Sequence, residues 1–332
     1  MADGRWPSFS LTFFTPLNRL QSSPVLVSCI PSRRTPDPRL PTHFLLALPM
    51  VHTDEQLYRI IDTALVEDIG EGDHSTLCCI PADARGRAVL KIKQAGILAG
   101  MHVAEQVFRH REPAARFIAY KHDGDSMQPG EQAFEIEAAV HVILQCERLV
   151  LNCMQRMSGI ATLTRQYADK LHGYSTKILD SRKTTPNVRF LEKEAVRIGG
   201  GENHRWGLHD MILLKDNHID YCGGIARALE KAWQYVRMYQ PGLKIEIETR
   251  NLEEVKQVLA TGKANRVMLD NFTPAQIREA LDLIGGRLET EASGGIRLDN
   301  IEEYAKTGVD YVSVGGLIHQ ARSLDMSLKA LI

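Results

Sequence analysis

The chain has 332 residues, of which 44% are hydrophobic and 24% charged, and its formal net charge is −1. This composition is that of an ordinary globular protein, and the length is enough for one large or two medium domains. A net charge so near zero excludes a protein that binds nucleic acid or an anionic membrane through overall basicity. No apolar run has the length of a membrane span. We therefore expect no nucleic-acid partner and no membrane partner.

The cysteines indicate a reducing compartment. They stand at positions 29, 78, 79, 146, 153 and 222, and none forms a CxxC pair or a zinc-binding spacing. Free thiols are the expected state of such cysteines, because disulfides persist mainly in oxidising environments. We expect a cytoplasmic protein.

The first fifty residues differ from the rest of the chain. Eight of the fourteen prolines fall there, with five arginines and only two acidic residues. Such a segment buries too little apolar surface to fold by itself. We interpret 1–50 as a disordered or untranslated extension. Translation from Met50 is the favoured reading, and a transit peptide is the alternative.

Residues 51–172 combine helix and strand patterns and are expected to form an α+β domain. Gly159 lies within the last helix, and a glycine in that position indicates close packing. The expected elements are helices at 54–70, 102–112 and 147–171, a strand within 87–100, and two strands within 115–140 around a turn at Pro129-Gly130.

Residues 173–332 show a different pattern, in which short apolar runs alternate with amphipathic helices. This alternation predicts right-handed βαβ units and a parallel sheet. Only six runs are visible, so the pattern favours an irregular barrel with fewer than eight strands. We also expect the last helix to return to the first domain. The runs are 176–183, 211–217, 243–249, 266–272, 288–295 and 311–316, and the helices are 223–239, 251–262 and 273–286, with caps expected at Asn251, Thr273 and Asp299.

Each apolar run ends in residues with useful chemistry. The ends are Ser181-Arg182-Lys183, Lys215, Glu248, Asp270, Ser293-Gly294-Gly295 and Gly315-Gly316. In parallel barrels the active site is built at the carboxyl ends of the strands, so we expect these residues to lie on one rim.

The residue types indicate phosphate and carboxylate binding. Glycine turns before helices expose backbone N–H groups to a phosphate. Glu248 and Asp270 can hold Mg²⁺, which takes one or two protein carboxylates and several waters. Arg182, Arg205 and Lys215 supply positive charge for an anion.

Each feature alone has a structural interpretation. A glycine turn needs no ligand, and a strand-end Asp can cap a helix. Lys215 can pair with Asp216, and His204 can be a structural histidine. The basic residues can also form a solvated face. The joint placement of these residues at strand ends favours a site.

Several segments carry a resemblance to a known family. ERLVLN, SGIAT, DSRKTTP, RIGGGENHRWGLHDMILLKDNH, EIET, MLDNF, EASGGI and VDYVSVGG together resemble the quinolinate phosphoribosyltransferases, also called carboxylating nicotinate-nucleotide pyrophosphorylases. The resemblance extends from about residue 54 to the C-terminus. It implies an α/β sandwich followed by an irregular α/β barrel, and a glycosyltransferase of NAD biosynthesis. That enzyme joins quinolinate to phosphoribosyl pyrophosphate and releases pyrophosphate and CO₂, leaving nicotinate mononucleotide.

The resemblance also implies roles for single residues. The quinolinate pocket would comprise Arg182, His204, Arg205 and Lys215, with Arg148 donated by the partner in a homodimer, or in a higher oligomer. Lys183, Glu248 and Asp270 would be catalytic and would surround phosphoribosyl pyrophosphate and its Mg²⁺. Its phosphates would be bound by Ser181, Ser293, Gly294, Gly295, Gly315 and Gly316. Many relatives have Thr where this chain has Ser181. The EIE stretch offers both Glu246 and Glu248, and we choose Glu248 because the loop to Leu252 follows it.

Three alternatives remain. A sister phosphoribosyltransferase would act on nicotinate or another nitrogen heterocycle. An inactive phosphate sensor or scaffold could use the same barrel, although it would not need Glu248 and Asp270. A protein that binds nucleic acid through a basic face would show steep salt dependence.

Overall fold

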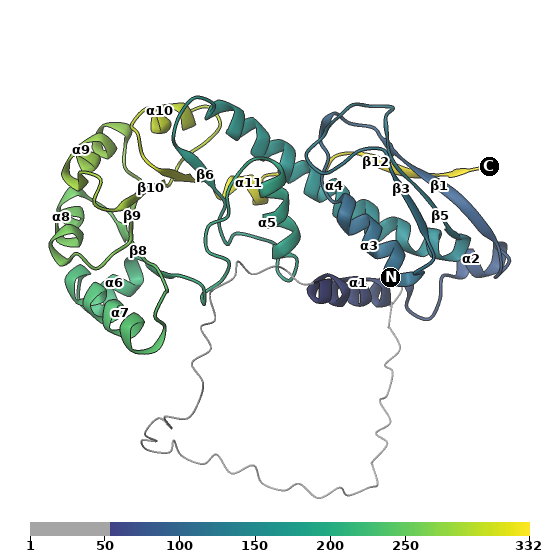
Figure 1. The fold of residues 1–332 in the computed structure, drawn as a ribbon, viewed down its shortest axis with the longest axis horizontal. Coiled ribbons are helices and arrows are strands. Elements are labelled where there is room, and N and C mark those ends of the chain that lie inside the picture. The colour runs from purple at the N-terminus through teal and green to yellow at the C-terminus, as the bar shows by residue number, and fades with distance from the viewer. Residues whose placement is uncertain (1–53) are drawn as a thin grey trace, which may run out of the picture. The chain divides into compact units, whose positions relative to one another are not determined.

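The computed structural model of the chain describes residues 54–332. The predictions made for residues 1–50, an extension and a start at Met50, lie outside the described residues. Within the described chain an antiparallel sheet with helices precedes a parallel sheet with helices, so the expected α/β sandwich and irregular α/β barrel are confirmed (Figure 1).

The sandwich domain is built on a four-stranded antiparallel sheet in the order β12-β1-β5-β3. Phe134 and Phe108 are fully buried between this sheet and the helices. The elements of this domain are α1 (Asp54–Ile69), α2 (His74–Cys79), β1 (Arg85–Ile92), β2 (Gly96–Ile97), α3 (Met101–Arg111), β3 (Arg116–Ala119), β4 (Ser126–Met127), β5 (Gln132–Ala139) and α4 (Val140–Lys170).

The element that returns to the sandwich domain is a strand, so the expectation of a last helix is wrong. Met326–Leu331 form β12, which pairs antiparallel with β1 and places Leu328 opposite Leu90. Met326 and Leu328 are buried, whereas Lys329 is exposed. Burial on alternate residues is the pattern of a strand with one face on the core.

Helix α4 links the two domains. It begins at Val140, seven residues before the expected start at residue 147, and runs to Lys170. A Cβ built on Gly159 would lie 2.0 Å from the carbonyl oxygen of Arg322, so the predicted close packing at this glycine is confirmed. The backbone before β12 thus rests directly on α4, at a place where any side chain would push it away.

The barrel domain contains a six-stranded parallel sheet in the order β6-β11-β10-β9-β8-β7. β6 (Lys177–Leu179) and β7 (Ile212–Leu214) are its two outer strands, and a single bridge joins Leu179 to Glu202 beyond β6. The ring is therefore irregular, as predicted. The other strands are β8 (Ile245–Thr249), β9 (Arg266–Asp270), β10 (Glu289–Ser293) and β11 (Tyr311–Ser313).

The helices of this domain connect its successive strands. They are α5 (Arg189–Ile198), α6 (Asp216–Cys222), α7 (Ile225–Tyr239), α8 (Leu252–Thr261), α9 (Pro274–Ile284), α10 (Ile301–Ala305) and α11 (Gly316–His319). The predicted caps at Asn251 and Thr273 are confirmed, since each side chain accepts a hydrogen bond from the helix it precedes. The predicted cap at Asp299 is wrong, because Asn300 is the residue before α10.

Candidate active site

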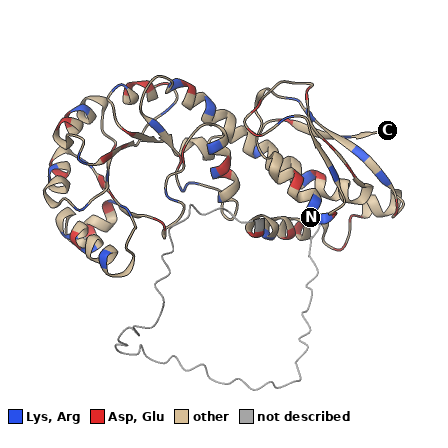
Figure 2. Cartoon of the chain, viewed as in Figure 1, with Lys and Arg blue, Asp and Glu red and all other residues tan. Residues whose placement is uncertain are grey.

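The polar strand ends lie side by side at the carboxyl edge of the parallel sheet. In the register of the sheet, Asp270 at the end of β9 is opposite Ser293 at the end of β10. Glu248 lies on β8 opposite Met268, two residues before Asp270 on the neighbouring strand. Figure 2 shows acidic residues on the inner strands of the barrel domain. Neighbouring parallel strands thus bring residues from distant parts of the chain to one rim.

Arg182 and Arg205 form the positive centre of this rim. Burial, and then the charge of the Arg182 guanidinium, lower the pKa of Arg205. The Nε atoms of both side chains are buried and have no hydrogen-bond partner among the described residues. Two like charges held close together with buried, unpaired donors are the arrangement expected of an anion site.

Lys215 belongs to the next part of the rim. Its Nζ lies 3.1 Å from Oε2 of Glu248. Burial raises the pKa of Asp270, although the charges of Lys215 and Lys183 oppose the rise. The ammonium groups of these lysines are therefore close enough to Asp270 to act on its charge. The described ion pair of Lys215 is with Glu248, and no described contact joins Lys215 directly to the two arginines.

The glycine turns lie beside the lysines and carboxylates. A Cβ built on Gly315 would come within 3.4 Å of Nζ of Lys183, so that ammonium group lies against the turn that ends in Gly316. Ser181 accepts a hydrogen bond from the backbone N–H of Lys183. A phosphate bound to the backbone of this turn would therefore lie close to the ammonium group of Lys183.

The turn after β10 requires glycine for two separate reasons. Gly294 and Gly295 have φ angles of +90° and +65°, in the region where other residues are strained. A Cβ on Gly294 would also lie 2.2 Å from Oδ1 of Asn271. This turn, which begins at Ser293, brings its backbone close to the residues after β9.

His204 lies below the rim rather than on it. Its side chain is only 7% exposed, and its Nε2 lies 3.1 Å from Oε2 of Glu246 and 3.3 Å from Oε2 of Glu291. Burial alone would lower the pKa of His204, but the two carboxylates outweigh burial and raise it to about 9. The ring also accepts a hydrogen bond at Nδ1 from the backbone N–H of Arg205. That bond opposes the effect of the two carboxylates on the pKa of His204, because a protonated Nδ1 has no lone pair to accept it.

A buried ion pair supports the loop that carries His204. Nζ of Lys193 on α5 lies 2.5 Å from Oδ1 of Asp180, and both side chains are fully buried. The same oxygen of Asp180 accepts the backbone N–H of His204, and Lys193 donates to the backbone carbonyl of His204. The pair therefore binds both backbone polar groups of His204.

The loop after β6 is held by a carboxylate that the sequence patterns did not single out. Glu192 accepts hydrogen bonds from both the backbone and the hydroxyl of Thr185. Arg156 on α4 donates to Glu192 as well, and to two carbonyl groups near α11. The loop after β6 is thus connected through Glu192 to α4, the helix that links the domains. The sequence signal for this residue is the amphipathic helix pattern of residues 189–198, which form α5 and bury Glu192.

Arg148 lies apart from this set. It is exposed on α4, in the part of that helix belonging to the sandwich domain, and among the described residues no contact joins it to Arg182, Arg205 or Lys215. A role for Arg148 in the same pocket would thus need a second chain.

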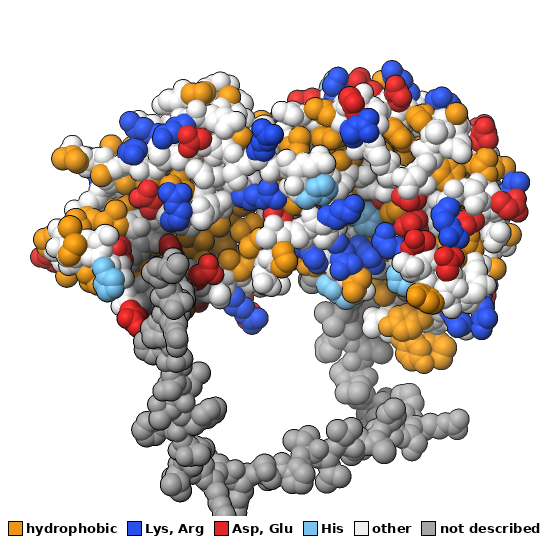
Figure 3. Space-filling view, turned by 180° about the vertical axis from the view of Figure 1, so that it is seen from behind, with side chains coloured by type: hydrophobic (Ala, Val, Ile, Leu, Met, Phe, Trp, Pro, Cys, Tyr) orange, Lys and Arg blue, Asp and Glu red, His pale blue; other side chains and the backbone are white. Residues whose placement is uncertain are grey.

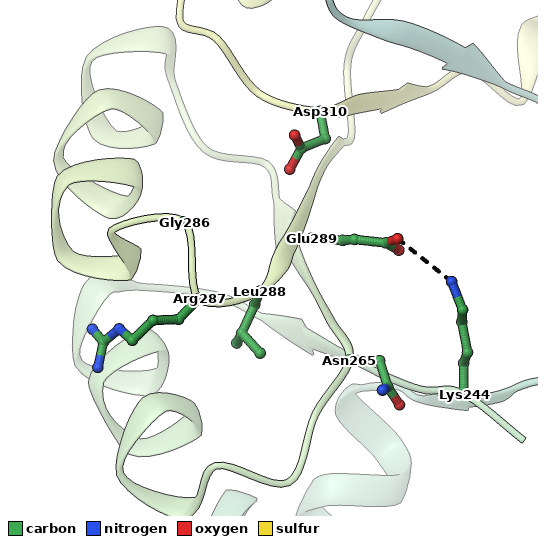
Figure 4. A pocket seen from close by; sticks show the side chains of 7 residues that line it. All are labelled: Lys244, Asn265, Gly286, Arg287, Leu288, Glu289 and Asp310. Atoms are coloured by element: carbon green, nitrogen blue, oxygen red, sulfur yellow. Dashed lines mark hydrogen bonds and ion pairs between the residues drawn. The ribbon is translucent and has the colours of Figure 1, made fainter. Parts of the chain in front are cut away.

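A shallow pocket lies at the opposite end of the parallel sheet. It has a volume of about 400 Å³, and Lys244 and Glu289 form an ion pair across it (Figure 4). Asn265 and Asp310 precede β9 and β11, so this pocket lies at the amino ends of the strands. The amino ends of barrel strands serve stability in known enzymes, and the rim at the carboxyl ends remains the candidate site.

The rim has the electrostatic character of an enzyme that handles phosphorylated and carboxylated substrates. Figure 3 shows Lys and Arg side chains gathered with histidines on one face of the barrel domain. Because acidic groups lie beside these cations, the rim can bind a diphosphate and a metal as well as a carboxylate. Among the described residues no helix is long and apolar enough to cross a membrane.

Comparison with known proteins identifies the family. Residues 73–158 match the sequence profile of the quinolinate phosphoribosyl transferase N-terminal domain, and residues 160–329 match that of its C-terminal domain. The chain belongs to the quinolinate phosphoribosyltransferase family.

Individual relatives are similar to this chain over most of its length. A Nicotiana tabacum protein named quinolinate phosphoribosyltransferase [decarboxylating] 2b, mitochondrial, is 40% identical over 296 residues, which are 85% of this chain and 84% of that protein. A Bacillus subtilis protein named probable nicotinate-nucleotide pyrophosphorylase [carboxylating] is 41% identical over 273 residues, 82% of this chain and 93% of that protein. The crystal structure of NadC from Streptococcus pyogenes superposes with a TM-score of 0.79 at 38% identity, covering 84% of this chain and 99% of that one.

Proposed function

We propose that the chain transfers the phosphoribosyl group of phosphoribosyl pyrophosphate to quinolinate and decarboxylates the product, giving nicotinate mononucleotide, pyrophosphate and CO₂. Membership of the family supports this reaction. The observation that carries it is the pair of buried, unpartnered Nε atoms of Arg182 and Arg205. Two guanidinium groups side by side match the two adjacent carboxylates of quinolinate.

The quinolinate pocket would be formed by Arg182 and Arg205, with Lys215 at its edge. His204 would act from beneath the pocket, since its ring nitrogens face Glu246, Glu291 and the backbone of Arg205. A monocarboxylate such as nicotinate would leave part of this positive charge unpaired, which is costly for partly buried groups. The arrangement therefore favours quinolinate over the nicotinate alternative.

Phosphoribosyl pyrophosphate would lie along the remaining rim. Lys183 would bind its phosphates beside Gly315 and Gly316, since the ammonium group lies against this turn. The turn formed by Ser293, Gly294 and Gly295 would receive the 5′-phosphate, because its backbone is open to close approach. Ser181 would complete the phosphate contacts.

Glu248 and Asp270 suit Mg²⁺ held mainly through water and diphosphate oxygens. Both are oxygen donors on neighbouring strands, which Mg²⁺ prefers. One oxygen of Glu248 already accepts from Lys215, and one of Asp270 accepts from Asn271, so each carboxylate keeps one oxygen for the metal or its waters. The ion would offset the negative charge of the departing pyrophosphate.

In this reaction the main roles of the protein are to orient the two substrates and to stabilise the charge that develops. The pyridine nitrogen of quinolinate attacks C1′ of the ribose, and the bond from C1′ to the pyrophosphate oxygen breaks. The carboxylates of Glu248 and Asp270 face the positive charge that develops at C1′. Holding both substrates in line can contribute up to about 7–11 kcal/mol.

Decarboxylation would follow the transfer. The bond between C2 and its carboxylate breaks, and its electron pair remains on C2, which then takes a proton from water. The positive pyridinium nitrogen formed by the transfer stabilises this carbanion. Before transfer, the arginine contacts would stabilise the carboxylate and oppose its loss. CO₂ is thus expected only when the phosphoribosyl donor is present.

A homodimer would complete the site with Arg148 of the partner subunit. The exposure of this arginine and its lack of a described contact with the pocket in its own chain support the proposal. A cytoplasmic location is part of the same proposal, and the free thiols of the described cysteines support a reducing compartment.

One coupled assay tests the proposed reaction. Purified protein is mixed with Mg²⁺, phosphoribosyl pyrophosphate and an equimolar mixture of quinolinate and nicotinate, and the nucleotide is followed by mass spectrometry with isotopically labelled acids. We expect label only from quinolinate in the nucleotide, with one CO₂ for each product molecule. Label from nicotinate alone would establish the sister activity, and no turnover would favour the inactive sensor.

A further inference from the structure

The interior of the barrel below the rim holds two buried carboxylates that the reaction does not use. Glu246 on β8 and Glu291 on β10 are both 0% exposed. Arg266 at the start of β9 contacts Glu291 at 3.2 Å and Glu246 at 4.0 Å. From the other side, Nε2 of His204 contacts both carboxylates at 3.1 and 3.3 Å. The carboxylates are therefore enclosed between a permanent cation and a histidine ring.

These contacts are close but incompletely satisfied. Both oxygens of Glu246, one of Glu291 and Nε2 of His204 lack a well-aligned hydrogen bond among the described residues. Burying such groups costs stability, and well-packed apolar residues are often no less stable in their place. Stability alone therefore does not explain why carboxylates occupy these two positions. Their contact with His204 offers a different explanation.

The His204 ring carries this contact to the quinolinate pocket. Its Nδ1 accepts the backbone N–H of Arg205 at 2.7 Å. A ring nitrogen that accepts in this way has no proton, so the ring proton lies on Nε2, the atom that faces the two carboxylates. The side chain of Arg205 then turns back to donate from Nη1 to the carbonyl of Met211 and presents its buried Nε without a partner. The carboxylates, the ring and the backbone of Arg205 are thus connected.

A metal ion is the other occupant that one histidine and two carboxylates can accommodate, since their ligand atoms lie within 4.8 Å of one another. Arg266 already lies against both carboxylates and supplies the positive charge that a metal would otherwise bring. The distances from Nε2 to the two carboxylates, 3.1 and 3.3 Å, are those of an ion pair, although Nε2 makes no well-aligned hydrogen bond among the described residues.

We propose that Glu246 and Glu291 are positioning residues for the quinolinate pocket: they hold His204 with its proton on Nε2, and the free Nδ1 then fixes the backbone from which the Arg205 guanidinium extends. This inference rests on the proposed function and adds two residues to it. It assigns them to the quinolinate side of the site alone, because phosphoribosyl pyrophosphate would bind through Lys183 and the glycine turns.

The kinetic test compares Glu246→Gln and Glu291→Gln with Glu289→Gln in the full-length protein. Glu289 is the matched control, since it contacts the same Arg266 at 2.9 Å and makes no described contact with His204. We expect each of the first two variants to raise KM for quinolinate about tenfold or more, which is the effect of losing one hydrogen bond to a charged group. KM for phosphoribosyl pyrophosphate should stay nearly unchanged. The control should leave both constants unchanged. Equal increases in both constants, or an equal effect of Glu289→Gln, would contradict a positioning role.

A second measurement on the unmodified protein remains decisive where a variant does not fold. Imidazole ¹⁵N NMR, with the His204 signals assigned by their loss in His204→Asn, reports which ring nitrogen carries the proton. We expect Nε2 protonated and Nδ1 unprotonated; the reverse tautomer would overturn the proposal, and so would a ring protonated on both nitrogens, because Nδ1 could then not accept from the backbone of Arg205. Elemental analysis of the same sample should find no stoichiometric metal, and a metal that is lost in Glu246→Gln would equally overturn it. Neither measurement depends on turnover, so its result is separable from a failure of the proposed reaction.

Discussion

Lys193 and Asp180 form a fully buried ion pair, with 2.5 Å between Nζ and Oδ1, directly beneath the loop that carries His204 and Arg205. The pair joins α5 to the end of β6 and binds the backbone N–H and carbonyl of His204. The segment after β6 and the loop that carries His204 and Arg205 are therefore held together by one interaction inside the barrel.

Removing one partner of this pair should lower the free energy of unfolding far more than removing both. Lys193→Met leaves the Asp180 carboxylate buried without its cation, and we expect a loss of about 3–5 kcal/mol in the free energy of unfolding. The double variant Asp180→Leu/Lys193→Met should lose much less. Its activity should remain low, because His204 has lost both backbone partners. Denaturant unfolding of the wild type, Asp180→Leu, Lys193→Met and the double variant measures this, and a loss in the double variant equal to the sum of the two single losses would show that the two side chains do not interact.

The buried carboxyl of Asp180 should leave a signature in the pH dependence of stability. Burial raises the pKa of Asp180 to about 6, although Lys193 opposes the rise. An acid whose pKa is raised on folding binds its proton more tightly in the folded protein. Its contribution to stability is therefore largest below the ordinary Asp pKa of about 4, and is lost as the pH rises from there to about 6.

Denaturant unfolding of the wild type and Asp180→Asn between about pH 4 and pH 6 measures this contribution. The free energy of unfolding of the wild type should rise less steeply with pH than that of the variant over this range. Parallel curves would mean that the pKa of Asp180 is the same in both states.

Arg205→Ala should lower kcat/KM for quinolinate by more than about tenfold, because a charged bidentate contact contributes about 1.5–3 kcal/mol. Arg205→Lys should recover only part of the loss, since an ammonium group cannot form the paired contact. Steady-state kinetics with either substrate varied gives the answer. Wild-type kinetics in both variants would remove Arg205 from the pocket.

A mixture of two inactive variants tests the shared site. Arg148→Ala removes the arginine proposed to act across the interface, and Lys183→Ala removes a lysine of the same chain's rim. When the two proteins are mixed and allowed to exchange subunits, one intact site per mixed dimer should restore about a quarter of the wild-type activity, the statistical result for random pairing. Each variant alone serves as its control, and activity that stays at their level after demonstrated exchange would place Arg148 outside the partner's site.

Gly159→Ala should destabilise the protein, although alanine is the better helix former by about 1 kcal/mol. The added Cβ would lie 2.0 Å from the carbonyl oxygen of Arg322, so α4 and the segment before β12 must move apart. We expect a net loss of about 1–3 kcal/mol. A melting temperature at or above that of the wild type would show that this segment can shift without cost.

Much of the fold follows from local signals in the sequence. The parallel strands are short apolar runs that end in polar residues, and Thr273-Pro274 and Asn251 mark their helices directly. β12 was missed because six residues with alternate burial are too few to distinguish a strand from a helix turn without the partner strand β1. The start of α4 was placed late because β5 runs into it without a polar break.

The rim residues can be predicted from the sequence, whereas the residues beneath them cannot. Glu248 and Asp270 stand at strand ends, where a polar residue after an apolar run is visible in the sequence. Glu246 and Glu291 lie within their strands, and their burial beside His204 depends on how the barrel brings β8, β10 and residue 204 together. Tertiary contact alone distinguishes Glu246 from Glu248, two residues apart on the same face of β8.

The order of the two chemical steps is the most direct test of the account, because it depends on positive charge both in the pocket and on the pyridine ring. Quinolinate labelled with ¹³C in its 2-carboxylate is incubated with the protein and Mg²⁺, first without and then with phosphoribosyl pyrophosphate, and ¹³CO₂ is measured by mass spectrometry. We predict no labelled CO₂ until the donor is added, and then one molecule for each nicotinate mononucleotide formed. Labelled CO₂ in the absence of the donor would contradict the account.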